Sequence, residues 1–307
     1  MSGGRQLVAL LGATVSGKTE VAVRLRERLP VEVVSADSRQ VRRGMRIGTA
    51  APTDAELAAV PHHLVGVVEP DAAWTVADWL DGVRAALESI WARNGVPLLV
   101  AGTGHYAWSL LEGRSIPRVA PNAELRAELE AFADEQGDAA LVARLERVDP
   151  VSAGRIDGRN RRRVIRALEI VEATGEPVPP LNDAPPDFEW AAVGLRWPRR
   201  ELYARADRRA ERMYADGLVE ETRELVGRHG REFDALTSIG YAEALRVVEG
   251  EWTAERAVER TKTATHRLIR MQGTWFREGD ERIRWVDARE PEAVLDAVEA
   301  AVTAPVR

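Results

Sequence analysis

The sequence contains no cysteine in its 307 residues. This absence excludes disulfide bonds, zinc or iron–sulfur sites with thiolate ligands, and catalysis by a cysteine nucleophile. The sequence also lacks any run of 18 apolar residues, so no membrane-spanning helix is expected. The residues after Met1 lack the apolar core and cleavage site of a secretory signal. These absences predict a cytoplasmic protein with no membrane partner.

Positive charge is not in excess either. Lys and Arg number 43 against 49 Asp and Glu, which gives a net charge of −6. This balance excludes a uniformly basic nucleic-acid-binding surface but leaves room for local basic patches. Hydrophobic residues make up 45% and charged residues 30%, as is typical of a chain with a packed core. A length of 307 residues fits about two domains.

Short apolar runs alternate with helical patterns in the first third of the chain. The runs cover residues 6–11, 31–36 and 96–101, and the helical patterns cover residues 20–29 and 76–93. Such alternation predicts an α/β fold, a parallel sheet flanked by helices. Later in the chain we expect a strand at 190–195, helices at 199–227, 241–249 and 254–277, a strand at 282–286 and a last helix at 291–302.

Residues 116–187 show a different pattern, with no convincing strand. Leu125 and Leu129 begin an apolar helical repeat, and several prolines at 177–186 indicate an extended linker. We therefore expect an all-helical insertion domain. The predicted division is a catalytic core at 1–115, the helical insertion domain at 116–187 and the second part of the core at 188–307.

The clearest motif is a phosphate-binding loop at residues 12–19, which fits G-x-x-x-x-G-K-[ST] between an expected strand and an expected helix. Such a loop directs backbone N–H groups at phosphate oxygens, at the positive end of the helix. Lys18 adds a point charge, and the Thr19 hydroxyl can join a Mg²⁺ shell. The motif predicts a P-loop NTPase-like sheet. The expected phosphate-binding residues are Gly12, Thr14, Val15, Ser16, Gly17, Lys18 and Thr19.

Two further polar residues follow strands that should end at the same edge of the sheet. Asp37 follows the second expected strand and could be a Mg²⁺ ligand, a general base or the N-cap of the next helix. Thr103 follows the third expected strand and could donate a hydrogen bond to a leaving-group oxygen or only cap a helix. The residues alone leave these roles open.

Several blocks of residues together resemble the tRNA dimethylallyltransferases, also called tRNA isopentenyltransferases. The blocks occur in the order and approximate spacing of that family, along nearly the whole chain. The sequence Ala-Asp-Ser-Arg-Gln at 36–40, beside a P-loop, is specific to this family. The other blocks lie at 43–45, 47–50, 61–64, 102–106, 162–169, 239–241 and 272–277.

The resemblance implies a transferase that moves the dimethylallyl group of dimethylallyl diphosphate to N6 of the adenine 3′-adjacent to the anticodon. It favours tRNAs that read codons beginning with U, and it implies release of diphosphate. The P-loop would then hold the diphosphate of the donor, with Mg²⁺, and not ATP. It also implies that Lys18 and Arg209 neutralise the diphosphate, that Thr103 lies near the bridging oxygen, and that Asp37 accepts the proton of the amine.

The resemblance further implies contact with the anticodon stem-loop of tRNA, whose target base should leave its stack to reach a cleft. Residues 155–166 contain six arginines and one acid, and residues 260–284 also carry net positive charge. The alternative for the first patch is a solvated helix face that pairs with acids such as Glu169. The expected tRNA-binding residues are Asp37, Ser38, Arg39, Gln40, Arg161, Arg162, Arg163, Gly240 and Tyr241.

Some positions depart from the family pattern. In the loop, neither substituted side chain carries the chemistry. The lost lysine and arginine, at Ala51 and Met271, concern tRNA affinity or substrate choice more than catalysis. The departures are Ala13 for proline and Val15 for alanine in the loop, then Arg42 for tyrosine, Arg46 for aspartate, Ala51 for lysine, His105 for leucine and Met271 for arginine.

Three rival functions share the same motif. A P-loop small-molecule kinase would use Asp37 to activate a hydroxyl group. An adenylate isopentenyltransferase would act on a free nucleotide, but the helical insertion and the arginine patches favour tRNA. A P-loop binding module without turnover would leave Asp37 and Thr103 without a role. We expect the enzyme to act as a monomer.

Overall fold

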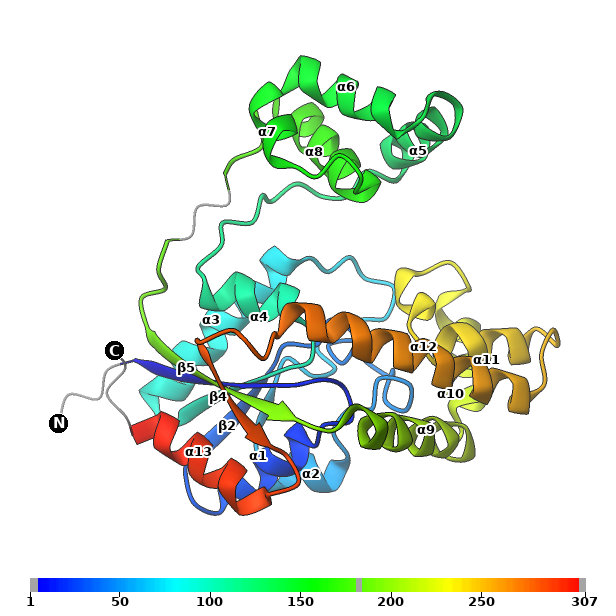
Figure 1. Ribbon diagram of the computed structural model, residues 1–307. Helices are drawn as coiled ribbons and strands as arrows, with labels where there is room; N and C mark the ends of the chain where they lie inside the picture. Colours follow the sequence, from blue (N-terminus) through cyan, green and yellow to red (C-terminus); the bar gives the residue numbers. More distant parts are fainter. Residues whose placement is uncertain (1–4, 181–183, 304–307) are drawn as a thin grey trace. The chain divides into compact units, whose positions relative to one another are not determined.

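The computed structural model describes residues 5–180 and 184–303, and its centre is a six-stranded sheet (Figure 1). The strand order is β3–β2–β4–β1–β5–β6, and every neighbouring pair runs parallel. This confirms the expected α/β fold. The strands are β1 (Gln6–Leu11), β2 (Val31–Ser35), β3 (His62–His63), β4 (Val96–Ala101), β5 (Glu189–Arg196) and β6 (Ile283–Asp287).

Helices cover both faces of this sheet. In Figure 1, α1 and α13 lie together on one face, while α3 and α4 lie on the other. Two of these helical regions begin with a side-chain cap: Thr53 and Thr75 each accept a hydrogen bond from the backbone three residues later. The helices are α1 (Lys18–Arg26), α2 (Asp54–Ala59), α3 (Val76–Ala92), α4 (Gly104–Leu111) and α13 (Pro291–Thr303).

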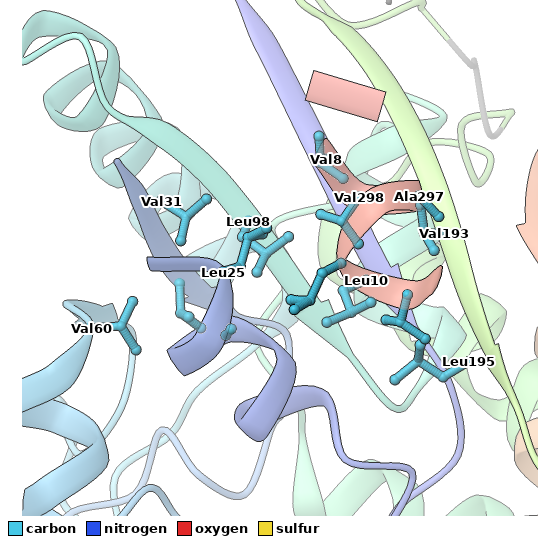
Figure 2. Packing of buried hydrophobic residues seen from close by; sticks show 14 residues of the cluster. Val8, Leu10, Leu25, Val31, Val60, Leu98, Val193, Leu195, Ala297 and Val298 are labelled. Atoms are coloured by element: carbon cyan, nitrogen blue, oxygen red, sulfur yellow. The ribbon is translucent and has the colours of Figure 1, made fainter. Parts of the chain in front are cut away.

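An apolar cluster fills the space between the sheet and the α1 and α13 face (Figure 2). Leu10, Leu98 and Val193 enter it from three strands, and Leu25 enters it from α1. Each fully buried side chain of this size stabilises the fold by roughly 1.5–3 kcal/mol. The cluster fixes the strands in register, so the loops after β1, β2 and β4 leave the sheet at one edge.

The expected helix at 199–227 is two helices, so that prediction is wrong. Gly217 separates α9 from α10 and adopts a left-handed backbone with φ of 98°. Glycine adopts this conformation without steric cost, and it ends the first helix. The chain therefore turns here and adds a group of helices beyond the sheet. They are α9 (Arg199–Ala215), α10 (Leu218–His229), the 3₁₀ helix η1 (Asp234–Thr237), α11 (Tyr241–Val248) and α12 (Ala254–Trp275).

Residues 112–185 form a second compact unit with its own core. Leu129, Leu141, Leu145 and Val164 are buried in that core. The described part of this unit contains helices and no strand, and residues 181–183 of the expected proline-rich linker lie outside it. The helices are α5 (Ala123–Gln136), α6 (Asp138–Val148), α7 (Pro150–Arg155) and α8 (Arg161–Thr174).

Within residues 5–180 and 184–303, no helix combines the length and the apolar character that crossing a bilayer requires.

One buried carboxylate ties the second unit together. Glu169 is 1% exposed and accepts hydrogen bonds from the Nε of Arg126 at 2.9 Å and the backbone N–H of Asn122 at 2.6 Å. Arg166 forms an ion pair with the same carboxylate. Burial alone would raise the pKa of Glu169, but these hydrogen bonds outweigh it and lower the pKa below its usual value. Arg166 therefore pairs with an acid on its own helix, which was the alternative to tRNA contact that the sequence left open for this residue.

We predict that Glu169→Ala destabilises residues 112–185 by about 2–4 kcal/mol, because it leaves a buried N–H and two guanidinium groups without their acceptor. Hydrogen exchange followed by mass spectrometry on the full chain should show faster exchange in α5 and α8 and unchanged exchange in the sheet. The effect should shrink below about pH 4, where a carboxylate with a lowered pKa loses its contribution as it takes up a proton. Glu172→Ala, an exposed position on α8, is the matched control. Equal exchange in the two variants would contradict the assignment.

Candidate active site

The loops that follow β1, β2 and β4 open into one cleft of about 840 Å³, with α9 and α12 on its other side. A volume of this size suits a small-molecule ligand. The structure brings most of the expected diphosphate-binding, catalytic and tRNA-binding residues of the core together here, although Gly12 is not among the lining residues. Those that line the cleft are Thr14, Val15, Ser16, Gly17, Lys18, Thr19, Asp37, Ser38, Arg39, Gln40, Thr103 and Arg209.

The phosphate-binding loop has the backbone shape of an anion-binding site. Val15 and Gly17 adopt left-handed conformations, with φ of 59° and 93°. A left-handed residue in such a loop makes successive N–H groups converge on one point. The Nζ of Lys18 donates to the carbonyl oxygens of Gly12 at 2.9 Å and Ala13 at 2.8 Å. Lys18 therefore lies along the loop and begins α1, as the motif predicts.

Two basic groups lie close together in this cleft. Burial, together with the charge of Arg209, lowers the pKa of Lys18 to about 7. Burial also lowers the pKa of Arg209 to about 10, although Asp37 opposes both shifts. Arg209 donates from Nη2 to the Thr14 hydroxyl at 2.5 Å, which holds it against the loop. Two partly desolvated cations that raise each other's energy favour the binding of a multiply charged anion between them.

Asp37 caps the turn that follows β2. Its Oδ1 accepts from the backbone N–H of Arg39 at 2.8 Å and of Gln40 at 3.2 Å. Its Oδ2 has no hydrogen-bond partner among the described residues, and Asp37 lines the cleft. The capping role therefore exists, and one oxygen stays available to accept a proton or to bind a metal.

Thr103 lies at the end of β4, next to the segment that carries Asp37. Its hydroxyl donates to the carbonyl oxygen of Ala36 over a long 3.4 Å. That weak bond can give way to a better acceptor in the cleft. Gln272 of α12 is 4% exposed and accepts from the Thr14 N–H at 2.9 Å. The sequence singled out Gln272 only as part of a block of residues, without a role.

Tyr241 does not lie where a tRNA-binding side chain would. It is fully buried, and its hydroxyl donates to Glu221 and accepts from the backbone N–H of Gly48 at 3.2 Å. A Cβ atom at Gly48 would lie 2.3 Å from the tyrosine ring, so only glycine fits there. The tRNA contact expected at Tyr241 stays a prediction, and its side chain is buried in this structure. Tyr241 supports the cleft wall at Gly48, while Gly240 starts α11 with φ of 93°.

Sequence reasoning missed part of the basic lining of the cleft. Arg205, Arg208 and Arg212 share one face of α9 with Arg209, at helical spacings of three and four residues. Arg208 and Arg212 are exposed and have no acidic partner within 4 Å among the described residues. Their spacing was the available signal, because residues i, i+3, i+4 and i+7 of a helix face the same side.

The arginines of α8 fall into two kinds. Arg161 forms ion pairs with Glu130, Asp134 and Asp138, at 3.3, 2.6 and 2.6 Å. Arg162 and Arg163 are exposed and have no acid within 4 Å in the part of the chain that the structure describes. The charge of Arg161 is therefore already balanced, whereas its two neighbours remain available to an anionic partner.

The departures at Arg42 and Arg46 have structural partners. Arg42 is buried and donates to the carbonyl oxygens of Glu69, at 3.2 Å, and Ala72. Arg46 pairs with Asp54 at 2.6 Å. Arg42 thus holds a surface loop in place and does not reach the cleft.

Comparisons with known sequences agree with the geometry of the cleft. Residues 40–279 match the IPP transferase family, and residues 5–63 match the isopentenyl transferase family. A tRNA dimethylallyltransferase of Chloroflexus aggregans is 48% identical over 274 residues, which cover 89% of this chain and 93% of that protein. One of Herpetosiphon aurantiacus is 43% identical over 295 residues, covering 95% and 93%.

Solved structures are similar over nearly the same span. The full-length tRNA isopentenylpyrophosphate transferase of Bacillus halodurans superposes with a TM-score of 0.70 at 35% identity, covering 97% of each chain. A eukaryotic dimethylallyltransferase acting on tRNA has a TM-score of 0.74 at 22% identity, covering 92% of this chain and 74% of that one, and supports the fold alone. Taken with the cleft and its phosphate-binding loop, these matches show that the chain belongs to the IPP transferase family.

Proposed function

We propose that this enzyme transfers the dimethylallyl group of dimethylallyl diphosphate to N6 of the adenine 3′-adjacent to the anticodon of tRNAs that read codons beginning with U. The observation that carries the proposal is a single cleft in which an anion-binding loop and two partly desolvated cations face a carboxylate with one free oxygen. The names of the relatives support the same activity. No comparable observation favours a kinase.

In the proposed reaction the N6 atom attacks C1 of the dimethylallyl group while the C–O bond to the diphosphate breaks. The bonding electron pair leaves with the diphosphate, and the allylic carbon carries positive charge in a loose transition state. Lys18, Arg209 and the loop N–H groups would stabilise the charge that develops on the leaving group. Thr103 would donate to the bridging oxygen, and Asp37 would accept the N6 proton. Positioning of the amine contributes as much as base strength.

Mg²⁺ fits this site as a proposed cofactor that is held largely by the substrate. Among the described residues there is no cluster of three or more His, Cys, Asp or Glu side chains suited to a metal. Mg²⁺ commonly keeps several waters and binds substrate phosphates with few protein ligands. The hydroxyl of Thr19, which lines the cleft at the start of α1, is the protein ligand we propose. When bound, the ion would neutralise part of the diphosphate charge.

The anticodon stem-loop would bind through arginines that have no acid partner. Arg208 and Arg212 lie at the cleft, and Arg162 and Arg163 lie on α8 of the second unit. Each such contact can release a counterion from the RNA backbone. The target adenine would leave its stack to reach Asp37. Ser38, Arg39 and Gln40 line the cleft beside it. To contact the RNA, Arg39 would first have to give up its 2.9 Å ion pair with Asp234.

The proposal includes action as a monomer and, because tRNA is the substrate, a cytoplasmic location.

Labelled dimethylallyl diphosphate, offered with Mg²⁺ and either unmodified tRNA or AMP, tests the activity. The label should appear on tRNA, at the adenine 3′-adjacent to the anticodon, and a tRNA with guanine at that position should stay unlabelled. Label on AMP alone would indicate an adenylate isopentenyltransferase. In a parallel incubation with ATP, phosphoryl transfer without any prenyl transfer would indicate a kinase. Either result would contradict the proposal.

The lowered pKa of Lys18 makes donor binding depend on pH. Diphosphate favours the charged ammonium and raises its pKa, so binding should take up a proton. Affinity should be highest below about pH 7 and should fall as the pH rises through the pKa of the free site, about 7. Calorimetry in buffers of different ionisation enthalpy measures the uptake. Lys18→Met, which leaves only the titration of the diphosphate itself, is the control. An identical pH profile in both proteins would refute the assignment.

Asp37→Asn separates the three roles of Asp37. Asparagine caps a turn as well as aspartate does, so the fold should persist. Loss of a general base should slow single turnover by about 10²- to 10⁴-fold and leave calorimetric donor affinity nearly unchanged. A parallel loss of Mg²⁺-dependent donor affinity would indicate a metal ligand instead. A rate within about threefold of wild type would remove Asp37 from the chemistry.

The two kinds of arginine on α8 should respond differently to charge removal. Arg162→Gln or Arg163→Gln should weaken tRNA binding and flatten its salt dependence by about one unit of logarithmic slope. Arg161→Gln should change the slope little, because three acids already balance that charge. Filter binding over a range of salt concentrations measures all three slopes. The assignment fails if Arg161→Gln flattens the slope most.

A further inference from the structure

Val15 is the strained residue of the phosphate-binding loop. Its left-handed backbone, with φ of 59°, is unusual for a β-branched residue, because the side chain crowds the backbone. The loop nevertheless requires this conformation to direct its N–H groups towards one anion. Other parts of the protein must therefore keep Val15 in it.

Two side chains from outside the loop bond to neighbouring loop carbonyls. The Nε of Arg205, on α9, donates to the carbonyl oxygen of Val15 at 2.8 Å. The Nε1 of Trp197, between β5 and α9, donates to the carbonyl oxygen of Ser16 at 3.0 Å. The guanidinium of Arg205 lies 4.5 Å from the centre of the Trp197 ring, so the two donors support each other.

These bonds fix the orientation of two peptide planes. In a trans peptide the C=O of one residue and the N–H of the next point in opposite directions. A donor on the carbonyl of Val15 therefore sets the direction of the Ser16 N–H, and a donor on the carbonyl of Ser16 sets that of the Gly17 N–H. Ser16 and Gly17 both line the cleft. The Ser16 N–H so placed donates to the carbonyl oxygen of Ala13 at 3.3 Å and closes the turn that contains Val15. The pair thus supports this turn and orients the Gly17 N–H, which would meet the phosphates.

The Val15 side chain adds a second restraint. It packs against an apolar cluster that includes Leu202 and Ala206 of α9 and Ile269 of α12. The same helix that carries Arg205 therefore holds both the backbone and the side chain of Val15. Contacts from outside the loop, most of them on α9, therefore help to balance the strain at Val15.

We propose that Trp197 and Arg205 form a positioning pair that holds Val15 in its left-handed conformation and so keeps the loop ready for diphosphate. The inference deepens the proposed function and rests on it for the identity of the anion. It assigns Trp197, which the reaction itself does not require, to donor affinity. Arg205 also lines the cleft and could touch the diphosphate directly, so Trp197 provides the cleaner test.

The experiment measures binding of inorganic diphosphate with Mg²⁺ to the full chain by calorimetry. Trp197→Phe keeps an aromatic ring beneath Arg205 and removes the N–H donor together with part of the indole ring. Its affinity should fall about tenfold, since the left-handed region disfavours a non-glycine residue by a factor of roughly 5–30. Adding Val15→Gly should restore affinity to within about threefold of wild type, because glycine adopts this backbone freely. Adding Val15→Ala, which also removes the packing but keeps the backbone penalty, should not restore it.

Thermal unfolding of each variant separates positioning from general damage. Glycine removes packing contacts of Val15, so it can restore binding only through the backbone and not through stability. Unchanged binding in Trp197→Phe, or equal effects of the glycine and alanine substitutions, would overturn the proposal. Normal diphosphate binding without prenyl transfer would overturn the proposed function and leave this inference standing. A wild-type protein that binds no diphosphate would overturn both.

Discussion

The burial of two cations, Lys18 and Arg209, beside the phosphate-binding loop is the constraint around which this site is arranged. Burial lowers the pKa of each, and the charge of Arg209 lowers that of Lys18 further. Asp37 opposes both shifts, but its Oδ1 is already used to cap the following turn. A ligand with several negative charges would relieve the imbalance, and a diphosphate carries that charge in a compact group. The same cations would then stabilise diphosphate as it leaves.

Distant parts of the chain hold these charges in place. The apolar cluster between the sheet and α1 fixes where β1, β2 and β4 end. The phosphate-binding loop, Asp37 and Thr103 follow these strands closely in the chain, so their positions are fixed as well. The helices beyond the sheet complete the cleft, since α9 carries Arg209 and α12 carries Gln272 against the loop. The buried hydrogen bonds of Tyr241 fix the wall at Gly48. Much of the site therefore depends on contacts across more than a hundred residues of sequence.

The features that could be read from the sequence are those with local causes. Apolar runs reveal strands, and a short glycine pattern reveals the loop. Asp37 and Thr103 can be placed together because parallel strands end at the same edge of a sheet. The two-residue strand β3 is too short for any period to show. The break at Gly217 depends on one residue's backbone, and the burial of Tyr241 depends on packing against a remote glycine. The neutralisation of Arg161 by acids on α5 and α6 is likewise a tertiary contact that composition cannot show.

The phosphate-binding loop should hold a prenyl diphosphate and not a nucleoside triphosphate. Calorimetric titration of the full chain with dimethylallyl diphosphate and, separately, with ATP, both with Mg²⁺, tests it most directly. The prenyl diphosphate should bind at least about tenfold more tightly than ATP, a difference of about 1.4 kcal/mol. Tighter binding of ATP, with no measurable binding of dimethylallyl diphosphate, would contradict it.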